Sequence, residues 1–294
     1  MPDDAAVARD AAEAEAAFSH PAVKPDTTVA YGEHPDQVVD LYAPRGDAHG
    51  AGSAPLVVVL HGGAWRAPYD RQHVTPFADF LARRGFAVAN VEYRRGSPIP
   101  AQGGTSPVAG RWPETFDDVA AAFDALPALV RDALPSADPR RTVVTGHSAG
   151  GHLALWAAAR HLLPADAPWR TGRPALLRGV VALAPIADFR TAEALEVCGG
   201  AAAQLLGGTD RFEERLPYAD PAALLPSGIA TTVVQGRTDI VVPQEVSEAY
   251  ADAAAKAGEV VGLTLLEDVG HFPLIDPAAD ACAVVAEEIA QLAF

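Results

Sequence analysis

The chain has 294 residues and a formal net charge of −16, because 38 acidic residues outnumber 22 basic ones. Nucleic acids and anionic membranes attract clustered positive charge, so this balance argues against both as partners. The chain contains no run of roughly 18 apolar residues, and it begins with an acidic segment instead of an apolar signal core. We therefore expect a cytoplasmic protein with a large buried core, for which a homodimer is the one assembly left open.

Residues 1–26 are rich in alanine and acidic residues and predict a frayed helical extension. After them, strand and helix signals alternate, which is typical of a mostly parallel central sheet flanked by helices on both faces. In chain order, the sequence predicts strands at 27–31, 37–42 and 56–60, a helix at 71–84, a strand at 86–91, a helix from 115, a strand at 142–145, a helix after 148, strands at 179–183 and 231–234, a helix at 243–257, a strand at 260–266 and a helix at 277–292. We expect residues 27–294 to form a single α/β domain.

Two stretches interrupt this alternation. Residues 96–113 are crowded with glycine, proline and serine and predict a long loop, of the kind that is usually functional or mobile. Residues 188–226 lie between two strands and are too long for one crossover helix, so they predict a small cap or lid insertion. The two cysteines, Cys198 and Cys282, are widely spaced, which favours free thiols over a disulfide in the cytoplasm.

The pentapeptide GHSAG at 146–150 separates a β-branched run from an apolar, alanine-rich run. A strand, a sharp turn and a helix are therefore expected there, and the paired glycines allow the bend that exposes the hydroxyl of Ser148. The alternative is a serine at an ordinary helix N-cap, which would leave the two glycines unexplained. We interpret Ser148 as a nucleophile.

A serine hydroxyl attacks a carbonyl only when a base removes its proton, and the base needs a carboxylate to fix its tautomer. His271 follows the last predicted strand, and Asp239 follows the strand before it. The order Ser148, Asp239, His271 and the placement at strand ends match the nucleophile, acid and base of the α/β-hydrolase fold. Asp188, after the strand at 179–183, is the alternative acid.

The segment HGGAW at 61–65 directly follows the strand at 56–60. Glycines there allow backbone amides to point at a reacting oxyanion, and such amides are fixed in place before reaction. The alternative is a simple tight glycine turn. We expect His61 to brace this loop through a hydrogen bond, and we give Trp65 equal weight as a wall of the substrate pocket and as packing beneath the loop.

With HGGAW at 61–65 and GHSAGG at 146–151, the chain from about Val38 onward resembles an α/β-hydrolase of the HGGxW branch, which includes kynurenine formamidases and small carboxylesterases. The resemblance implies a triad of Ser148, Asp239 and His271. It also implies an oxyanion hole formed by the amides of three residues, Gly63, Ala64 and Ala149. Ala64 stands where formamidases often carry a tyrosine, which weakens the formamidase interpretation.

We therefore expect a serine hydrolase without a cofactor that cleaves small carboxylic esters through an acyl-enzyme. One alternative is an arylformamidase that hydrolyses N-formylkynurenine or a related N-formyl aromatic amide, and another is a non-catalytic binding protein on the same scaffold. His147 and His152 are spaced so that they do not share a helix face, and we expect no metal site. The expected partner is a small-molecule ester or amide. Arg94, Arg95 and Arg111 are interpreted as surface residues, with a substrate carboxylate as the less favoured role.

Overall fold

Aliphatic and β-branched runs along the chain form one eight-stranded sheet in the order β1-β2-β4-β3-β5-β6-β7-β8. The computed structural model describes residues 3–45, 53–96 and 108–294. The strands are β1 (Thr27–Ala30), β2 (Val38–Tyr42), β3 (Ala54–Leu60), β4 (Ala87–Val91), β5 (Ala137–His147), β6 (Gly179–Leu183), β7 (Thr231–Gly236) and β8 (Gly262–Leu266). Strands β3 to β8 run parallel, whereas β1 and β2 pair antiparallel to their neighbours. The prediction of a mostly parallel central sheet is confirmed.

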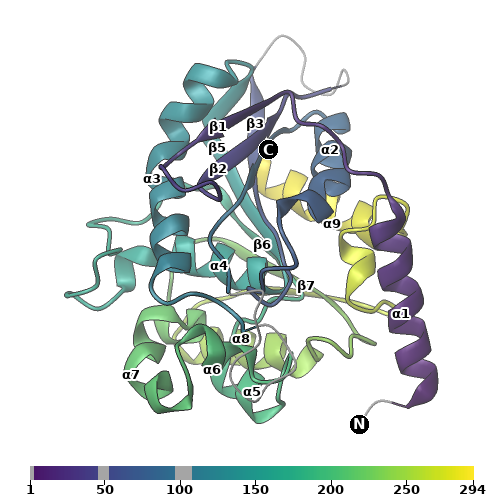
Figure 1. Cartoon of the computed structure of the whole chain (residues 1–294), viewed down its shortest axis with the longest axis vertical. Helices are drawn as coiled ribbons and strands as arrows, with labels where there is room; N and C mark the ends of the chain where they lie inside the picture. The colour runs from purple at the N-terminus through teal and green to yellow at the C-terminus, as the bar shows by residue number, and fades with distance from the viewer. Residues whose placement is uncertain (1–2, 46–52, 97–107) are drawn as a thin grey trace.

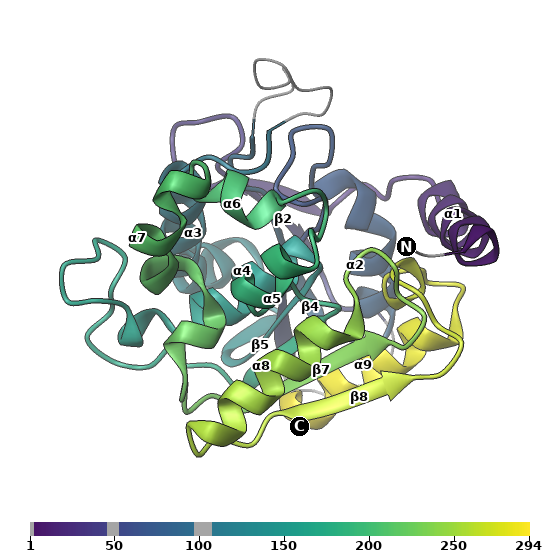
Figure 2. The same cartoon turned by 90° about the horizontal axis from the view of Figure 1, so that it is seen from below.

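Helices cover both faces of this sheet, as Figures 1 and 2 show. The helices are α1 (Asp4–Ser19), α2 (Thr75–Arg83), α3 (Glu114–Ala133), α4 (Ala149–Ala158), α5 (Phe189–Ala194), α6 (Ala201–Leu205), α7 (Thr209–Ala219), α8 (Gln244–Lys256) and α9 (Asp280–Ala293). Short 3₁₀ turns are η1 (Arg71–Val74), η2 (Arg160–Leu162), η3 (Pro221–Leu224) and η4 (Phe272–Leu274). Within the described ranges, no helix combines the length and the apolar character needed to cross a membrane.

The central strand β3 contributes to hydrophobic layers on both faces. All of its residues are buried, as expected for a continuous apolar run in a parallel sheet. Because successive side chains of a strand point to opposite faces, Val58 packs with residues of α3 and α4, and Val57 packs with residues of α2 and α9. These two layers fix the carboxyl ends of the parallel strands, where the predicted functional residues lie.

The observed elements differ from the predicted ones mainly at their ends. The helix expected at 71–84 begins as the separate turn η1, because Pro76 lies in the first turn of α2 and cannot donate a backbone hydrogen bond. The strand expected at 142–145 is the buried end of the longer β5, whose pairing with β3 shifts register between Pro55 and Leu56. Residues 97–107 of the predicted long loop lie outside the described residues.

The stretch predicted to be a cap, 188–226, contains α5, α6, α7 and η3 between β6 and β7. These helices group at the lower end of the molecule in Figure 1. They are tied to α4 by side chains that reach backbone carbonyls: Trp156 Nε1 donates to the oxygen of Tyr218 at 2.9 Å, and His152 Nε2 donates to that of Ala219 at 2.9 Å. The insertion is therefore anchored on the helix that follows Ser148.

The N-terminal segment is helical, as the sequence predicts. It forms the regular helix α1, which begins at the N-cap Asp3, whose carboxylate accepts the amide of Ala6 at 2.8 Å. Helix α1 packs against η4, so it lies beside the loop that follows β8. The predicted N-terminal helix is thus present as α1, and its contacts with η4 support a helix whose own amphipathic pattern is weak.

Candidate active site

Ser148 occupies a strained turn between β5 and α4. Its backbone has φ 57° and ψ −118°, a combination that residues with a Cβ atom rarely adopt. A Cβ added at Gly146 would lie 2.2 Å from the carbonyl oxygen of Gly150, and one added at Gly150 would lie 2.0 Å from that of Leu60. Both glycines are therefore required by close backbone contacts. Within the described residues, the Ser148 hydroxyl makes no cap hydrogen bond to α4, so the N-cap interpretation does not explain this serine.

His271 and Asp239 form a buried pair at the ends of β8 and β7. The Nδ1 atom of His271 lies 2.6 Å from Oδ2 of Asp239, and both side chains are almost completely buried. Because the carboxylate accepts the proton on Nδ1, the Nε2 atom of the neutral ring is left as the proton acceptor. This pair has the geometry of the acid and base predicted from chain order.

The carboxylate of Asp239 is held by further donors. Its Oδ1 accepts the amides of Val241 and Val242, each at 2.8 Å, and its Oδ2 accepts Nε2 of Gln235 at 3.2 Å. The alternative acid, Asp188, instead caps α5 by accepting the amide of Thr191 at 2.7 Å. The structure thus places Asp239 at the imidazole and gives Asp188 a helix-capping contact.

Ser148 and His271 line the same cavity, which has a volume of about 160 Å³. Gly63 and Ala64 of the predicted oxyanion loop line it as well. Other walls come from five aromatic or imidazole side chains: Phe18, Tyr69, His73, His147 and Phe272. The predicted nucleophile, the predicted base and two predicted amide donors therefore line one cavity.

The loop of residues 61–65 is tightly folded against the nucleophile. Gly63, Ala64 and Trp65 have successive left-handed φ angles of 100°, 50° and 55°. A Cβ at Gly62 would lie 2.9 Å from the carbonyl oxygen of His147 and 3.3 Å from Cβ of Ser148. Strain of this kind clusters at functional sites, and it is consistent with amides turned toward a reacting group.

The third predicted donor is the amide of Ala149. Ala149 is the first residue of α4, directly after Ser148. The first amides of a helix have no intrahelical acceptor, and the helix dipole adds partial positive charge at this end. The amide of Ala149 is thus available beside the nucleophile to bind a negatively charged oxygen.

His61 holds the glycine loop to the core. Its Nδ1 donates to the carbonyl oxygen of Gly62 at 2.8 Å, and its Nε2 donates to Oε1 of Glu92 at 2.8 Å. The ring stacks on Tyr93 with centroids 4.3 Å apart, and the Tyr93 hydroxyl donates to the backbone oxygen of His61 at 2.7 Å. Both ring nitrogens therefore face oxygen acceptors, one in the loop and one on Glu92. The expected hydrogen bond from His61 to the loop is present.

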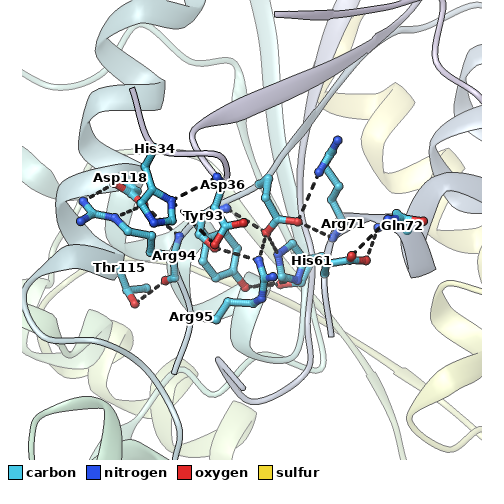
Figure 3. Close-up of polar contacts among 12 residues, drawn as sticks. His34, Asp36, His61, Arg71, Gln72, Tyr93, Arg94, Arg95, Thr115 and Asp118 are labelled. Carbon is cyan, nitrogen blue, oxygen red and sulfur yellow. Dashed lines mark hydrogen bonds and ion pairs between the residues drawn. The ribbon is translucent and has the colours of Figure 1, made fainter. Parts of the chain in front are cut away.

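Sequence reasoning missed Glu92, which is the centre of this network. Figure 3 shows His61, Arg71 and Arg95 converging, and all three contact the Glu92 carboxylate. Burial alone would raise the pKa of Glu92, but His61, Arg95 and the amide of Arg71 outweigh it and lower the pKa to about 2. A glutamate directly after the strand at 86–91, at the same sheet edge as the glycine loop, was the available signal.

His147 was considered only as a metal ligand. It links the turn that carries Ser148 to His271. Its Nε2 donates to the backbone oxygen of His271 at 3.0 Å, and the two rings lie 4.3 Å apart. Complete burial, followed by the influence of His271, lowers the pKa of His147 well below its usual value. His147 is therefore a neutral donor that fixes the backbone of His271.

Of the two roles considered for Trp65, the structure agrees with packing beneath the loop and not with a wall of the cavity over Ser148. The Trp65 side chain is fully buried, with its ring 5.1 Å from that of His152 and 5.9 Å from that of Phe189. In the part of the chain that the structure describes, Trp65 is not among the residues that line the cavity over Ser148. The left-handed backbone at Ala64 and Trp65 directs this indole into the core beneath the cap.

The three arginines weighed as partners of a substrate carboxylate have carboxylates of their own. Arg94 pairs with Asp118 at 2.7 Å, as Figure 3 shows. Arg95 contacts Glu92, and Arg111 pairs with Glu114 at 3.2 Å. These pairs give all three arginines structural contacts.

The chain resembles proteins with esterase and formamidase names. It is 30% identical over 148 residues to the probable carboxylic ester hydrolase LipM of Mycobacterium tuberculosis, a match that covers 50% of this chain and 30% of LipM. It is 23% identical over 252 residues to the kynurenine formamidase of Danio rerio, covering 86% of this chain and 76% of that enzyme. The chain thus spans less than a third of LipM and about three quarters of the formamidase.

Solved structures show the same fold. The inhibited esterase B of Lactobacillus rhamnosis superimposes with a TM-score of 0.70 at 21% identity, covering 98% of this chain and 93% of that one. Residues 39–253 match the family model BD-FAE, which is well over half of the chain. This chain has the α/β-hydrolase fold and belongs to the BD-FAE family.

Proposed function

We propose that the protein is a serine hydrolase that cleaves small carboxylic esters through an acyl-enzyme. The observation that carries this proposal is the buried pair of His271 and Asp239, joined at 2.6 Å, of which His271 lines the same cavity as the strained Ser148. A catalytic role accounts for the strained serine and the buried acid and base together. The esterase names of relatives and of structural neighbours support the same chemistry.

In the proposed reaction, Nε2 of His271 takes the proton of Ser148 as Oγ attacks the ester carbonyl carbon. The negative charge that develops on the carbonyl oxygen is met by the amides of Gly63, Ala64 and Ala149. The imidazolium then gives its proton to the departing alcohol, which leaves an ester between Ser148 and the acyl group. Water, activated by the same histidine, releases the acid and restores the serine.

Asp239 stabilises the imidazolium that forms in both half-reactions. Its carboxylate is fixed by backbone amides on one oxygen and by His271 and Gln235 on the other. A carboxylate held in this way does not need to reorient when the ring becomes charged, which lowers the barrier. No cofactor enters this proposal.

The proposal also covers the cap and the cellular setting. Cys198, from the insertion between β6 and β7, lines the cavity over Ser148, which supports a cap role for residues 188–226.

In the described part of the chain, Cys198 and Cys282 are free thiols, which supports a reducing, cytoplasmic setting. The proposed partner is a small-molecule ester.

An arylformamidase is the second candidate, and it is favoured by the kynurenine formamidase that matches 86% of this chain. A formyl amide would use the same serine, base and amides, and it differs from an ester only in its leaving group. The absence of a tyrosine at position 64 is the residue-level argument against this candidate.

Parallel assays of the purified protein with p-nitrophenyl acetate, p-nitrophenyl butyrate and N-formylkynurenine test the proposal. We expect kcat/KM to be highest for one of the esters. A formamide value far above every ester value would favour the arylformamidase. Absence of turnover on all three substrates would favour a binding protein.

A further inference from the structure

Helix α1 contacts both loops that carry the proposed acid and base. Nη2 of Arg9 donates to the backbone oxygen of Thr238 at 3.3 Å, and Oε1 of Glu13 accepts the amide of Gly270 at 3.2 Å. Thr238 directly precedes Asp239, and Gly270 directly precedes His271. In Figure 1, α1 lies along the edge of the molecule beside the yellow C-terminal segments that include η4. Two contacts thus reach the catalytic loops from a segment more than 200 residues away in sequence.

Gly270 is shaped to receive the Glu13 side chain. Its φ lies outside the left-handed region, so the backbone alone does not require a glycine there. A Cβ at Gly270 would lie 2.0 Å from Oε2 and 2.8 Å from Cδ of Glu13. The space beside the Cα atom of Gly270 is therefore filled by the end of the Glu13 side chain, which a larger residue at position 270 would displace.

The same peptide is held from its other side by β7. A Cβ at Gly236, the last residue of β7, would lie 2.2 Å from the carbonyl oxygen of Val269 and 2.4 Å from that of Gly270. The amide of Thr238 also donates to the oxygen of Val269 at 3.0 Å. The segment that leads into His271 is thus enclosed between the end of the sheet and the Glu13 carboxylate.

Two carboxylates of α1, those of Asp10 and Glu13, are partly withdrawn from water. Among the residues that the structure describes, Oδ1 of Asp10 and Oε2 of Glu13 are buried without a hydrogen-bond partner. Burial is the largest influence on both groups and raises the pKa of each, while the amide of Gly270 opposes this for Glu13. A helix that only covered the surface would leave such groups in water, where they are fully hydrated.

The end of α1 also borders the cavity over Ser148. Phe18 lines this cavity, with its ring 5.3 Å from that of Phe272 and 5.7 Å from that of His73. Phe18 and His73 also border a second cavity of about 180 Å³ next to the first. Helix α1 therefore contacts the site both at the loop of the base and at the substrate space.

We propose that α1 is a working part of the active site and that Glu13 is a positioning residue, which fixes the Gly270–His271 peptide and so the imidazole of His271. Glu13 touches neither the substrate nor the reacting atoms, and it acts through the backbone of Gly270. The catalytic consequence of this contact rests on the proposed hydrolase function, whereas the contact itself does not.

The test compares three variants of the full-length protein: Glu13→Ala, Glu13→Gln and Glu15→Ala. Glu15 lies on the same helix and is exposed, so its variant is the matched control. Glutamine keeps an oxygen that can accept the Gly270 amide, whereas alanine removes it. We expect Glu13→Ala to lower kcat on p-nitrophenyl acetate by on the order of tenfold with little change in KM, because small displacements of a catalytic group cost rate. Glu13→Gln and Glu15→Ala should stay within about twofold of the wild type.

A second readout does not depend on turnover. Hydrogen exchange of the Gly270 amide, followed by NMR, should accelerate on the order of tenfold in Glu13→Ala, because this amide loses its acceptor and the loop then opens locally. Exchange at Val58 in the central strand reports global opening and should not change. The Gly270 amide should exchange at the wild-type rate in Glu15→Ala.

Each outcome bears on the proposal. Unchanged Gly270 exchange in Glu13→Ala, an equal effect of Glu15→Ala, or a parallel acceleration at Val58 would overturn it. Faster Gly270 exchange with an unchanged kcat would show a contact that does not position the base, which also overturns it. If the wild type hydrolyses no ester but Gly270 still responds selectively to Glu13→Ala, the hydrolase function fails and the anchoring of the loop by Glu13 is supported.

Discussion

The glycine loop, residues 61–65, and the histidine loop, residues 268–272, face the same serine but are held by different parts of the molecule. The glycine loop is tied inward, through the fully buried His61, to Glu92 at the end of β4. The histidine loop is tied outward, through Gly270, to Glu13 on a peripheral helix. The oxyanion side of the site is therefore held by the core, whereas the base side is held by His147 of the core and, in addition, by the peripheral helix α1.

The largest effect is expected from removing the hydroxyl of Ser148, the residue that both loops face. Ser148→Ala should lower kcat by on the order of a million-fold, because the nucleophile acts together with its base. The hydroxyl makes no cap contact in the described structure, so the unfolding temperature should stay close to that of the wild type. Single-turnover kinetics and thermal unfolding of the same sample check both statements. If Ser148→Ala turned over within tenfold of the wild-type rate, Ser148 would not be the nucleophile.

Asp239→Asn should lower kcat by on the order of ten-thousand-fold, because an amide at this position favours the wrong tautomer of His271. Asp188→Asn is the matched control, since asparagine also caps helices well and Asp188 caps α5. We expect its kcat to lie within about threefold of the wild type. A large loss in Asp188→Asn with a small one in Asp239→Asn would reverse the assignment of the acid.

Glu92→Gln tests the contact between His61 and Glu92 that holds the glycine loop to the core. It leaves the surrounding positive groups without their charged partner, so the unfolding free energy should fall by about 3 kcal/mol, and the disturbed amides should cost about a hundredfold in kcat. Glu13→Ala removes the contact between α1 and the histidine loop, and it should lower the unfolding free energy by less than about 1 kcal/mol. Urea unfolding of the two variants makes the comparison directly. Equal losses of stability would contradict the contrast between the two loops.

The lowered pKa of Glu92 predicts that the unfolding free energy depends on pH in the acid range. The pKa of Glu92 is lowered from 4.5 to about 2 in the folded protein, so its charge stabilises the fold fully above pH 4.5. This contribution is lost as the pH falls from 4.5 toward 2. The difference in unfolding free energy between wild type and Glu92→Gln should therefore shrink over this window. A difference that stays constant below pH 4.5 would show that Glu92 is not held in its charged form.

The smallest expected effect is at the cavity wall on α1. Phe18 is 41% exposed, so Phe18→Ala should leave the fold unchanged. The loss of this wall should raise KM for p-nitrophenyl butyrate on the order of fivefold, with a smaller change for the acetate. Val7→Ala on the same helix, where Val7 is 50% exposed, is the control. Equal KM values for Phe18→Ala and wild type with both esters would show that Phe18 does not contact the substrate.

Local patterns explain why much of the site could be predicted. The GHSAG turn depends on contacts within a few residues and with the neighbouring strand, so its glycines and flanking runs carry the signal in one short segment. Asp239 and His271 were found because parallel strands bring their carboxyl ends to one edge, which converts order in the chain into proximity in space.

Other features depend on contacts that no local pattern records. The direction of the Trp65 side chain follows from left-handed backbone angles at a residue with a Cβ, which sequence alone does not indicate. The docking of α1 depends on Glu13 and Arg9 meeting loops that lie far along the chain. The weak amphipathic pattern of α1 gave no sign of a buried face, although its alanine and glutamate residues favour a helix.

The central claim is that Ser148 is a nucleophile activated by His271, and labelling with a fluorophosphonate tests it most directly. Intact mass measurement of the wild type should show one adduct per chain, and peptide mapping should place it on Ser148. His271→Ala should slow labelling by at least about a thousandfold, because the base no longer takes the proton. A wild-type protein that gains no adduct, or that gains one on a residue other than Ser148, would contradict the account.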